Sequence, residues 1–339
     1  MLNSNNKISI IFPSYNGENV IHDCLKSVEN LDNLNETELI IVDNNSTDSS
    51  IDIIKSFKKI NLIILIQKSN LGFARACNLA VNKAKGEFIF ITNQDVSFPE
   101  DFFTILLNLY MRIKKDKEII ISPAIVFPGH YINYFGAKVH FLGFSYTPMM
   151  YQKITRVKQT FKTLKASGCS IFMKRSAFIE MRGFDSYFFM YHEDTDLSLR
   201  AIRNGFLIYT TNETLLHHKK IHMTINNFSY YNIEKNRYIV LYKNIKSIKA
   251  LLPYFIIAEL MLLFQAILTR KVKLRLKIYR FLIQNYVLIK RLRYNKFNCE
   301  SKRFKKRDLD QHLDPIILGR ILSNVKILRY FLRIINLIL

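Results

Sequence analysis

The first 95 residues repeat a pattern that few folds accommodate: a short apolar run, a polar turn and a helix-like segment. The apolar runs cover residues 7–12, 38–42, 62–66 and 87–92. Each run has the length of one strand and is apolar almost throughout, which is typical of parallel strands covered on both faces. The sequence therefore predicts an α/β fold with a Rossmann-like, mostly parallel sheet.

Polar clusters follow three of these runs. Residues 13–16 follow the first run, residues 43–48 the second and residues 93–95 the fourth. Because ligands of such sheets bind beyond the carboxyl ends of the strands, we expect the three clusters to meet in one crevice. The chain has no G-x-G-x-x-G after its first strand and no G-x-x-x-x-G-K-[ST] motif. A dinucleotide-dependent dehydrogenase and a P-loop NTPase are therefore disfavoured.

A second informative stretch covers residues 167–205. Its aromatic-rich segment 187–191 comes just before three acids, Glu193, Asp194 and Asp196, and a helical pattern follows. Carboxylates crowded at a helix N-terminus beside aromatic side chains suit a tuned general base or a metal partner. Acids are also favoured in the first turn of an ordinary helix, so simple N-terminal charge is the alternative.

The segment between these regions is less regular. Strand-like pieces cover residues 119–127 and 138–144, and glycines interrupt them. We interpret this segment as the variable wall over the crevice, with aromatic side chains that suit an acceptor. The alternative is that it only completes the core.

Two adjacent histidines, His217 and His218, follow a short predicted strand at residues 206–209. Adjacent residues on a strand point to opposite faces, so at most one of the two can face the crevice as a metal ligand. A structural role is the alternative.

Four motifs, in order and at natural spacing, resemble family 2 glycosyltransferases of the GT-A fold, in particular the rhamnosyltransferase-like members that build bacterial surface polysaccharide. The motifs are IIFPSYNGENVIHDCLKSV, LIIVDNNSTDSS, NLGFARACNLAVNKAKGEFIFITNQDV and SGCSIFMKRSAFIEMRGFDSYFFMYHEDTDLSLRAIRNGF. Together they span residues 8 to about 218. The resemblance implies a nucleoside-diphosphate sugar as donor, rhamnose as the first candidate sugar, and a surface glycan or lipid-diphosphate-linked acceptor.

On the donor side, the resemblance implies that Asp43 reads the nucleotide base and that Pro13 and Tyr15 form one wall of the base pocket. Asp95 corresponds to the last residue of the family's D-x-D element, which holds a divalent cation on the donor diphosphate. The first acid of that element is Asn93 here, so one carboxylate is left. One carboxylate with phosphate oxygens still satisfies Mg²⁺ or Mn²⁺.

On the acceptor side, the resemblance implies that Asp194 is the catalytic base, with Glu193 and Asp196 beside it in the active-site wall and His217 as a further metal ligand. We expect the neighbouring acids and aromatic rings to raise the proton affinity of Asp194. A base opposite the leaving diphosphate implies inversion at the anomeric carbon. Arg75 is a candidate for diphosphate binding, and a surface arginine on an amphipathic helix is the alternative.

Charge divides the chain into two parts. Residues 1–218 carry 24 Lys and Arg against 21 Asp and Glu, whereas residues 219–339 carry 26 against 6. The second part is also rich in Leu and Ile, which fits an anionic membrane surface. Its aliphatic stripes exceed what a nucleic-acid arm needs, so we expect no nucleic-acid partner. We predict a GT-A catalytic domain at 1–223 and a helical, basic, membrane-associating region at 224–339.

Residues 251–268 form an apolar segment at the short limit for a membrane span, and Glu259 near its middle makes spanning costly. We favour amphipathic helices at 251–268, 270–277 and 320–339 that lie on the cytoplasmic face of the cell membrane, with a single span as the alternative. We expect residues 224–246 to pack on the catalytic domain. The N-terminus leads directly into a strand, so we expect no signal peptide.

Two rival functions stay open. A sugar-phosphate nucleotidyltransferase would need a Gly-rich, basic N-terminal loop for a triphosphate, and the sequence has none. A membrane-associated scaffold with a degenerate site is supported by Asn93 alone, and the acids Asp43, Asp95 and Asp194 argue against it.

Overall fold

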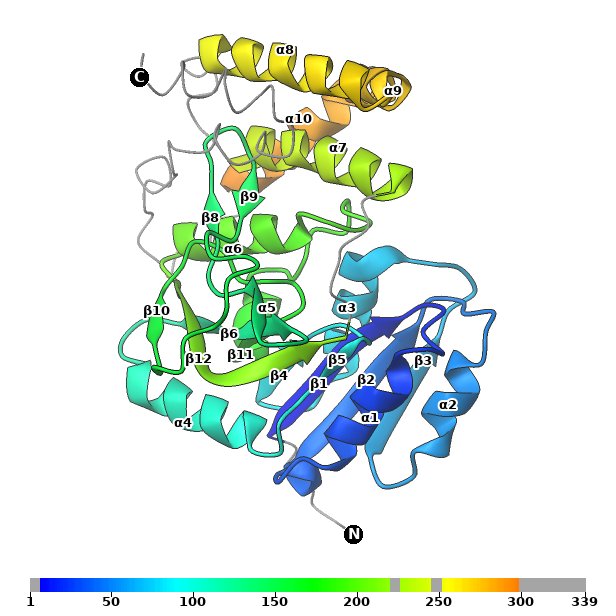
Figure 1. Cartoon of the computed structure of the whole chain (residues 1–339), viewed down its shortest axis with the longest axis vertical. Coiled ribbons are helices and arrows are strands. Elements are labelled where there is room, and N and C mark those ends of the chain that lie inside the picture. The colour runs from blue at the N-terminus through cyan, green and yellow to red at the C-terminus, as the bar shows by residue number, and fades with distance from the viewer. Residues whose placement is uncertain (1–6, 220–225, 245–251, 299–339) are drawn as a thin grey trace.

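The computed structural model describes residues 7–219, 226–244 and 252–298, which fold around a twisted mixed sheet (Figure 1). Its strands are β1 (Ile8–Ser14), β2 (Thr37–Asp43), β3 (Asn61–Ile66), β4 (Phe88–Ile91), β5 (Val96–Ser97), β6 (Ile119–Phe127), β7 (Tyr131–Tyr134), β10 (Thr160–Lys162), β11 (Ile171–Lys174) and β12 (Leu207–His218). The strand order in the described residues is β10-β12-β6-β11-β4-β1-β2-β3, with β5 paired to β12 and β7 to β6. A separate hairpin is formed by β8 (Lys138–Val139) and β9 (Ser145–Tyr146).

Helices cover both faces of the sheet. They are η1 (Leu34–Glu36), α1 (Ile21–Glu29), α2 (Ser50–Ser56), α3 (Gly72–Lys83), α4 (Phe102–Ile113), α5 (Arg175–Glu180), α6 (Glu193–Arg203), α7 (Asn227–Asn244), α8 (Leu252–Leu268), α9 (Val272–Gln284) and α10 (Tyr286–Asn298). One apolar core joins the sheet to α1, α2 and α4, and a second core joins its other face to α3, α5 and α6. The predicted α/β fold is confirmed, because strands β1, β2 and β4 are buried between two helical layers, while β3 is half-buried at the edge of the sheet.

The parallel pairs β1–β2 and β1–β4 bring three strand ends to one edge of the sheet. Ser14 pairs with Asp43 at the ends of β1 and β2, and β4 ends beside Ile11. Strand β11 runs antiparallel to β4, with Ile171 opposite Ile91. The loop before β11 therefore reaches the same edge as the three polar clusters.

Two strand predictions need correction. The predicted strand at 138–144 is short, because the chain turns at Gly143, where φ is +83°, and returns as β9. The predicted short strand at 206–209 is the start of β12, which runs on through a register shift between Thr211 and Leu215 to His218. The two histidines thus belong to the sheet itself.

The C-terminal helices lie above α6 in Figure 1, with α7 next to it and α8 and α9 beyond. Side chains of α7 bond to α6 and to the segment before it, so the packing expected for residues 224–246 is confirmed for the described part, 226–244. In the described part of the chain, no helix combines the length and the apolar character that crossing a bilayer requires. The predicted domain boundary at 223/224 and the predicted helix at 320–339 lie outside the described residues.

Gly72 links α3 to the aromatic segment before α6. Its φ is +78°, and a Cβ at this position would collide with the backbone oxygen of Phe189. That oxygen also accepts a hydrogen bond from the Phe73 N–H at 2.7 Å. The close approach requires a residue without a side chain.

We expect Gly72→Ala to destabilise the protein clearly more than Gly129→Ala. Both glycines have positive φ, which costs an L-residue about 1–2 kcal/mol. At exposed Gly129 the nearest atom to an added Cβ is a Tyr131 ring carbon at 3.1 Å, which can move aside. Urea unfolding measures both changes, and equal losses would contradict the role of the Phe189 contact.

Candidate active site

The three polar clusters meet at one edge of the sheet, as predicted. Gln94 accepts hydrogen bonds from the Ser14 hydroxyl at 2.8 Å and the Tyr15 N–H at 3.2 Å. The Asn16 N–H donates to the Ser46 hydroxyl at 3.0 Å. Side chains and backbone groups from all three clusters are therefore in contact at the ends of β1, β2 and β4.

Asp43 is the last residue of β2 at this edge and is fully buried. Its Oδ2 accepts a hydrogen bond from the Ser46 N–H at 3.0 Å, whereas its buried Oδ1 has no partner among the described residues. A buried acceptor without a donor is costly, so this oxygen suits an N–H group of a bound molecule. Tyr15, 48% exposed, and half-buried Pro13 stand at the same edge.

The two histidines at the end of β12 have different neighbours. His218 faces Asp95, with its Nε2 3.4 Å from Asp95 Oδ2. The ring of His217 contacts the His130 ring edge to face, and burial, followed by the nearby His130, lowers the pKa of His217. Both histidines and Asp95 line one pocket, but the direct contact is made by His218, since side chains alternate along β12. The assignment of His217 as a metal ligand stays a prediction.

A divalent cation fits the surroundings of Asp95. Its Oδ1 is buried and has no hydrogen-bond partner among the described residues, and half-buried Asn93 lies two residues away. Three or more His, Cys, Asp or Glu side chains gathered as a complete metal site are not found in the described chain. One carboxylate and one imidazole are a partial set that phosphate oxygens and water can complete.

Asp194 stands in the first turn of α6 and is buried. Its Oδ2 accepts hydrogen bonds from the Gly168 N–H at 3.0 Å and from the Lys165 ammonium at 3.1 Å. Its Oδ1 accepts from the Thr195 N–H at 2.6 Å and the Thr195 hydroxyl at 3.2 Å. Burial would raise the pKa of Asp194, but the Lys165 charge and the Gly168 N–H outweigh burial and lower it.

One loop connects Asp194 to the donor edge. The Gly168 N–H donates to Asp194, and the next residue, Cys169, accepts a hydrogen bond through its carbonyl from the Thr92 hydroxyl at 2.8 Å. Thr92 directly follows β4 and is three residues before Asp95. The two acidic centres therefore lie on either side of residues 167–170.

Glu193 has the raised proton affinity that the sequence led us to expect for Asp194. Burial, followed by the charge of Asp194, raises the pKa of Glu193 to about 8. Its Oε2 is buried without a hydrogen-bond partner among the described residues. At neutral pH Glu193 is therefore mainly protonated, whereas Asp194 is ionised.

One predicted wall residue lies elsewhere. Asp196 is fully buried and bonds to Arg200 and to Lys243 of α7, so it does not line a wall that an acceptor can touch. Helix periodicity explains this, because Asp196 lies on the side of α6 that faces the neighbouring helix. The Arg75 Nε donates to the Ser186 carbonyl at 2.9 Å, and the side chain is exposed, so its role in diphosphate binding stays a prediction.

The sequence did not reveal four residues that shape the site. Gln94 lies inside the predicted motif, but its amide bonds back to β1 instead of facing solvent. Lys165 and Gly168 come from the irregular segment and the turn after it. Asn236 of α7 donates from its amide to the carbonyls of both Met190 and Tyr191 at 2.8 Å, which only the tertiary fold reveals.

Glu193→Gln should stabilise the protein at alkaline pH. The folded state holds the Glu193 proton up to about pH 8, and the unfolded chain releases it near its ordinary pKa of 4.5. Stability that Glu193 contributes at low pH is therefore lost as pH rises through this window. The Tm gain of Glu193→Gln should be near zero at pH 4.5 and grow toward pH 8, whereas exposed Glu100→Gln should show no such trend. A flat difference would contradict the raised pKa.

Comparison with known proteins places this geometry in a family. The sequence profile described as glycosyl transferase family 2 matches residues 9–182. Poly(ribitol-phosphate) beta-glucosyltransferase from Bacillus spizizenii is 42% identical over 93 residues, which are 26% of this chain and 15% of that protein. A dolichyl N-acetyl-alpha-D-glucosaminyl phosphate 3-beta-D-2,3-diacetamido-2,3-dideoxy-beta-D-glucuronosyltransferase from Methanococcus voltae is 33% identical over 116 residues, 33% of this chain and 36% of that protein. The chain thus spans less than half the length of each.

Among solved structures, GalNAc-T7 with UDP, GalNAc and Mn²⁺ matches with a TM-score of 0.56 at 14% identity, over 70% of this chain and 48% of that chain. This likeness supports the shared fold. The profile match covers more than half of the 339 residues and includes β1, β2, β4 and the loop before β11. The chain therefore belongs to glycosyl transferase family 2 and has the GT-A fold.

Proposed function

We propose that this enzyme moves a sugar from a nucleoside-diphosphate donor, with inversion, to a surface glycan or a lipid-diphosphate-linked acceptor. The observation that carries the donor proposal is Asp43, a fully buried carboxylate at the end of β2 with one oxygen that has no hydrogen-bond partner among the described residues. Rhamnose is the first sugar to test, on the sequence resemblance. The relatives named for ribitol-phosphate and dolichyl phosphate acceptors support the acceptor class.

The unpartnered oxygen of Asp43 favours certain bases. Uracil, thymine and guanine each carry a ring N–H that can donate to a carboxylate, whereas adenine has no ring N–H on its pairing edge. A carboxylate acceptor is a strong discriminator, because a base without the donor leaves its charge unpaired. Exposed Tyr15 offers an aromatic surface on which such a base can stack.

We propose that Asp95 and His218 hold Mg²⁺ or Mn²⁺ on the donor diphosphate. When bound, the cation neutralises the charge that develops on the leaving diphosphate. Asn93, beside it, is neutral and contributes at most an amide oxygen. Two protein ligands in place of a full acidic set imply that the donor phosphates complete the site, so metal and donor should bind together.

Asp194 is the proposed base. In the transfer step its Oδ2 takes the proton of the acceptor hydroxyl while that oxygen forms a bond to the anomeric carbon. The bond from the anomeric carbon to the diphosphate oxygen breaks, and its electron pair leaves with the diphosphate. Glu193, mainly protonated at neutral pH, keeps a second negative charge away from Asp194.

The donor proposal predicts selective stabilisation by diphosphates. UDP, dTDP or GDP with Mn²⁺ should raise the Tm of the protein, because binding to the folded state stabilises it. ADP, or any of them with a chelator, should give a much smaller shift. Asp43→Asn should lose the discrimination against ADP. Equal shifts with all four nucleotides would contradict the role of Asp43.

The base proposal predicts that Asp194→Asn lowers the transfer rate by at least about 10²-fold, which is the range for a general base. Donor binding in the thermal assay should stay within about twofold of wild type. His218→Ala should instead raise the Mn²⁺ concentration needed for transfer, and His217→Ala is its matched control. Transfer by Asp194→Asn at the wild-type rate would exclude Asp194 as the base.

We further propose that the enzyme works at the cytoplasmic face of the cell membrane, with α8 lying on an anionic bilayer. One face of α8 is apolar and exposed over its whole described length, with side chains 46–63% exposed: Ile256, Ile257, Leu260, Phe264, Ile267 and Leu268. These positions are one, three or four residues apart, so they share one side of the helix. Ala258, Leu262 and Ala266 lie buried on the opposite side.

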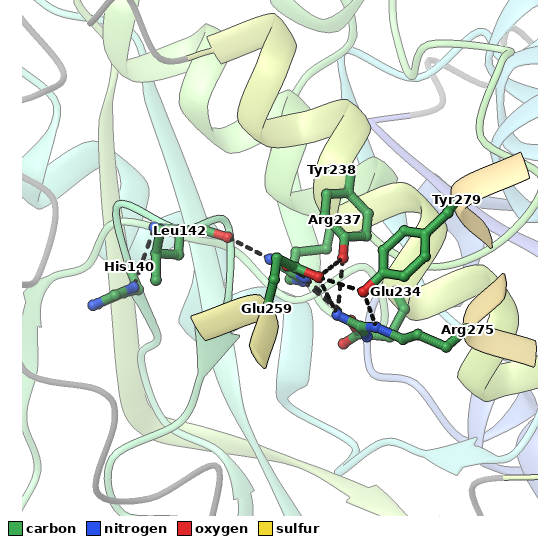
Figure 2. A network of polar contacts seen from close by, with 8 residues as sticks. All are labelled: His140, Leu142, Glu234, Arg237, Tyr238, Glu259, Arg275 and Tyr279. Carbon is green, nitrogen blue, oxygen red and sulfur yellow. Dashed lines mark hydrogen bonds and ion pairs between the residues drawn. The ribbon is translucent and has the colours of Figure 1, made fainter. Parts of the chain in front are cut away.

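The inner side of α8 is fixed by a buried ion network. Figure 2 shows Glu259 of α8 between Arg237 of α7 and Arg275 of α9, with Glu234 close by. Glu259 accepts from Arg237 at 3.0 Å and from Arg275 at 2.7 Å. The Tyr238 hydroxyl also donates to Glu259, at 2.5 Å. Because this acid points inward, it does not interrupt the apolar outer face.

Charge supports a bilayer as the occupant of this face. Residues 252–292 contain one acid, Glu259, and eight basic residues: Arg270, Lys271, Lys273, Arg275, Lys277, Arg280, Lys290 and Arg291. Of these, Arg275 is fully buried, and the others are exposed or half-buried. A basic residue near an anionic lipid surface contributes about 1 kcal/mol to binding.

Leu260→Glu combined with Phe264→Glu should abolish binding to vesicles of phosphatidylcholine with phosphatidylglycerol in a flotation assay. Met111→Glu on α4, which replaces a 75% exposed apolar side chain elsewhere, is the matched control and should bind like wild type. Salt should weaken binding, since screening shortens the range of attraction. Unchanged binding of the double variant would contradict this face. If the wild type is a dimer and the double variant is a monomer that still floats with the vesicles, the face binds a second copy of the chain instead.

A further inference from the structure

The carboxylate of Asp194 has no free position for a substrate in this structure. A carboxylate offers about four lone-pair sites. Gly168 N–H and Lys165 Nζ occupy Oδ2, and the Thr195 N–H and hydroxyl occupy Oδ1. A base must accept the hydrogen bond of the acceptor hydroxyl before it takes the proton. One of these four donors therefore has to leave.

Three of the four donors are fixed by the fold. The Gly168 and Thr195 N–H groups belong to the backbone, and Thr195 is fully buried in the same turn of α6. Lys165 differs, because its ammonium ends a flexible four-carbon stem and its side chain is 17% exposed. It also has a second partner, the Ser145 hydroxyl of β9, at 3.3 Å.

We propose that Lys165 is a positioning residue that occupies the place of the acceptor hydroxyl on Asp194 Oδ2 and moves away, toward Ser145, when the acceptor binds. This inference rests on the proposed role of Asp194 as the base. While Lys165 is in contact, it keeps Asp194 ionised in a buried site. When it leaves, the carboxylate loses its cation and becomes a stronger proton acceptor at the moment the hydroxyl arrives.

The other groups around Asp194 make Lys165 the main control of its charge. Glu193 is mainly protonated at neutral pH, and burial, followed by the Lys165 charge, lowers the pKa of His192 to about 4, so His192 is neutral. The Tyr134 hydroxyl of β7 is neutral as well, since burial raises its pKa further above the ordinary value of 10. Arg237 and Glu234 of α7 act on the neighbouring His192 with opposite signs.

The test is the pH profile of kcat/KM for three variants. Lys165→Met should move the acidic limb of the profile to higher pH, so that activity falls at least tenfold at pH 6 and stays within about threefold of wild type at pH 8.5, because each pH unit is a factor of ten in the ionised fraction. Lys165→Arg should keep the limb in place but lower kcat, because a forked guanidinium leaves the carboxylate less readily. Lys162→Met, an exposed lysine three residues away, should match wild type.

A purely structural role for Lys165 would give a lower Tm and a uniform loss of activity in Lys165→Met, with the acidic limb unmoved, and this outcome overturns the inference. Failure of the base assignment is a separate result. If Asp194→Asn transfers sugar at the wild-type rate, Asp194 is not the base, whatever Lys165 does. If Asp194→Asn is inactive and the Lys165→Met limb does not move, only the role of Lys165 is rejected.

Discussion

Asp196 holds together the two helices on which the active site depends. It is fully buried, its Oδ2 bonds to Arg200 at 2.8 Å, and its Oδ1 bonds to Lys243 at 3.0 Å and to the Asn244 amide at 3.1 Å. Removing one partner of a buried ion pair costs about 3–5 kcal/mol, because a charge is left without compensation. Helix α6, which carries Glu193 and Asp194 in its first turn, is therefore fixed by α7.

Helix α7 links the active site to the C-terminal helices. Its Asn236 holds the carbonyls of the two residues before His192, and Tyr191 and His192 both have positive φ in the turn that starts α6. The next residue, Arg237, bonds to Glu259 of α8. The same helix thus supports the turn before the proposed base and anchors the helix proposed to face lipid. The catalytic and C-terminal regions meet through buried polar contacts, which depend on direction and distance more strongly than apolar packing does.

Much of the catalytic half could be predicted from the sequence, because its signals are local. Continuous apolar runs identify β1 to β4, and their polar ends identify the edge of the sheet that carries Asp43 and Asp95. The direction of side chains was harder to predict from the sequence. The choice between His217 and His218 depends on the register of β12 after its irregularity at residues 211–215. Which of the two acids is protonated was still harder to predict. The pKa of Asp194 lies below that of Glu193 because Lys165 and Gly168 contact Asp194, and both lie over 20 residues away in the chain.

The four hydrogen bonds that occupy the Asp194 carboxylate have a consequence for hydrolysis of the donor, the side reaction of a transferase. A transferase that binds its donor first holds an activated sugar next to a base, and water is present at far higher concentration than any acceptor. With all positions of the carboxylate occupied, a water molecule has nowhere to be oriented or deprotonated. Only a partner that draws Lys165 away gains access to the base. With the roles proposed for Asp194 and Lys165, the closed carboxylate would protect the bound donor from hydrolysis until an acceptor binds.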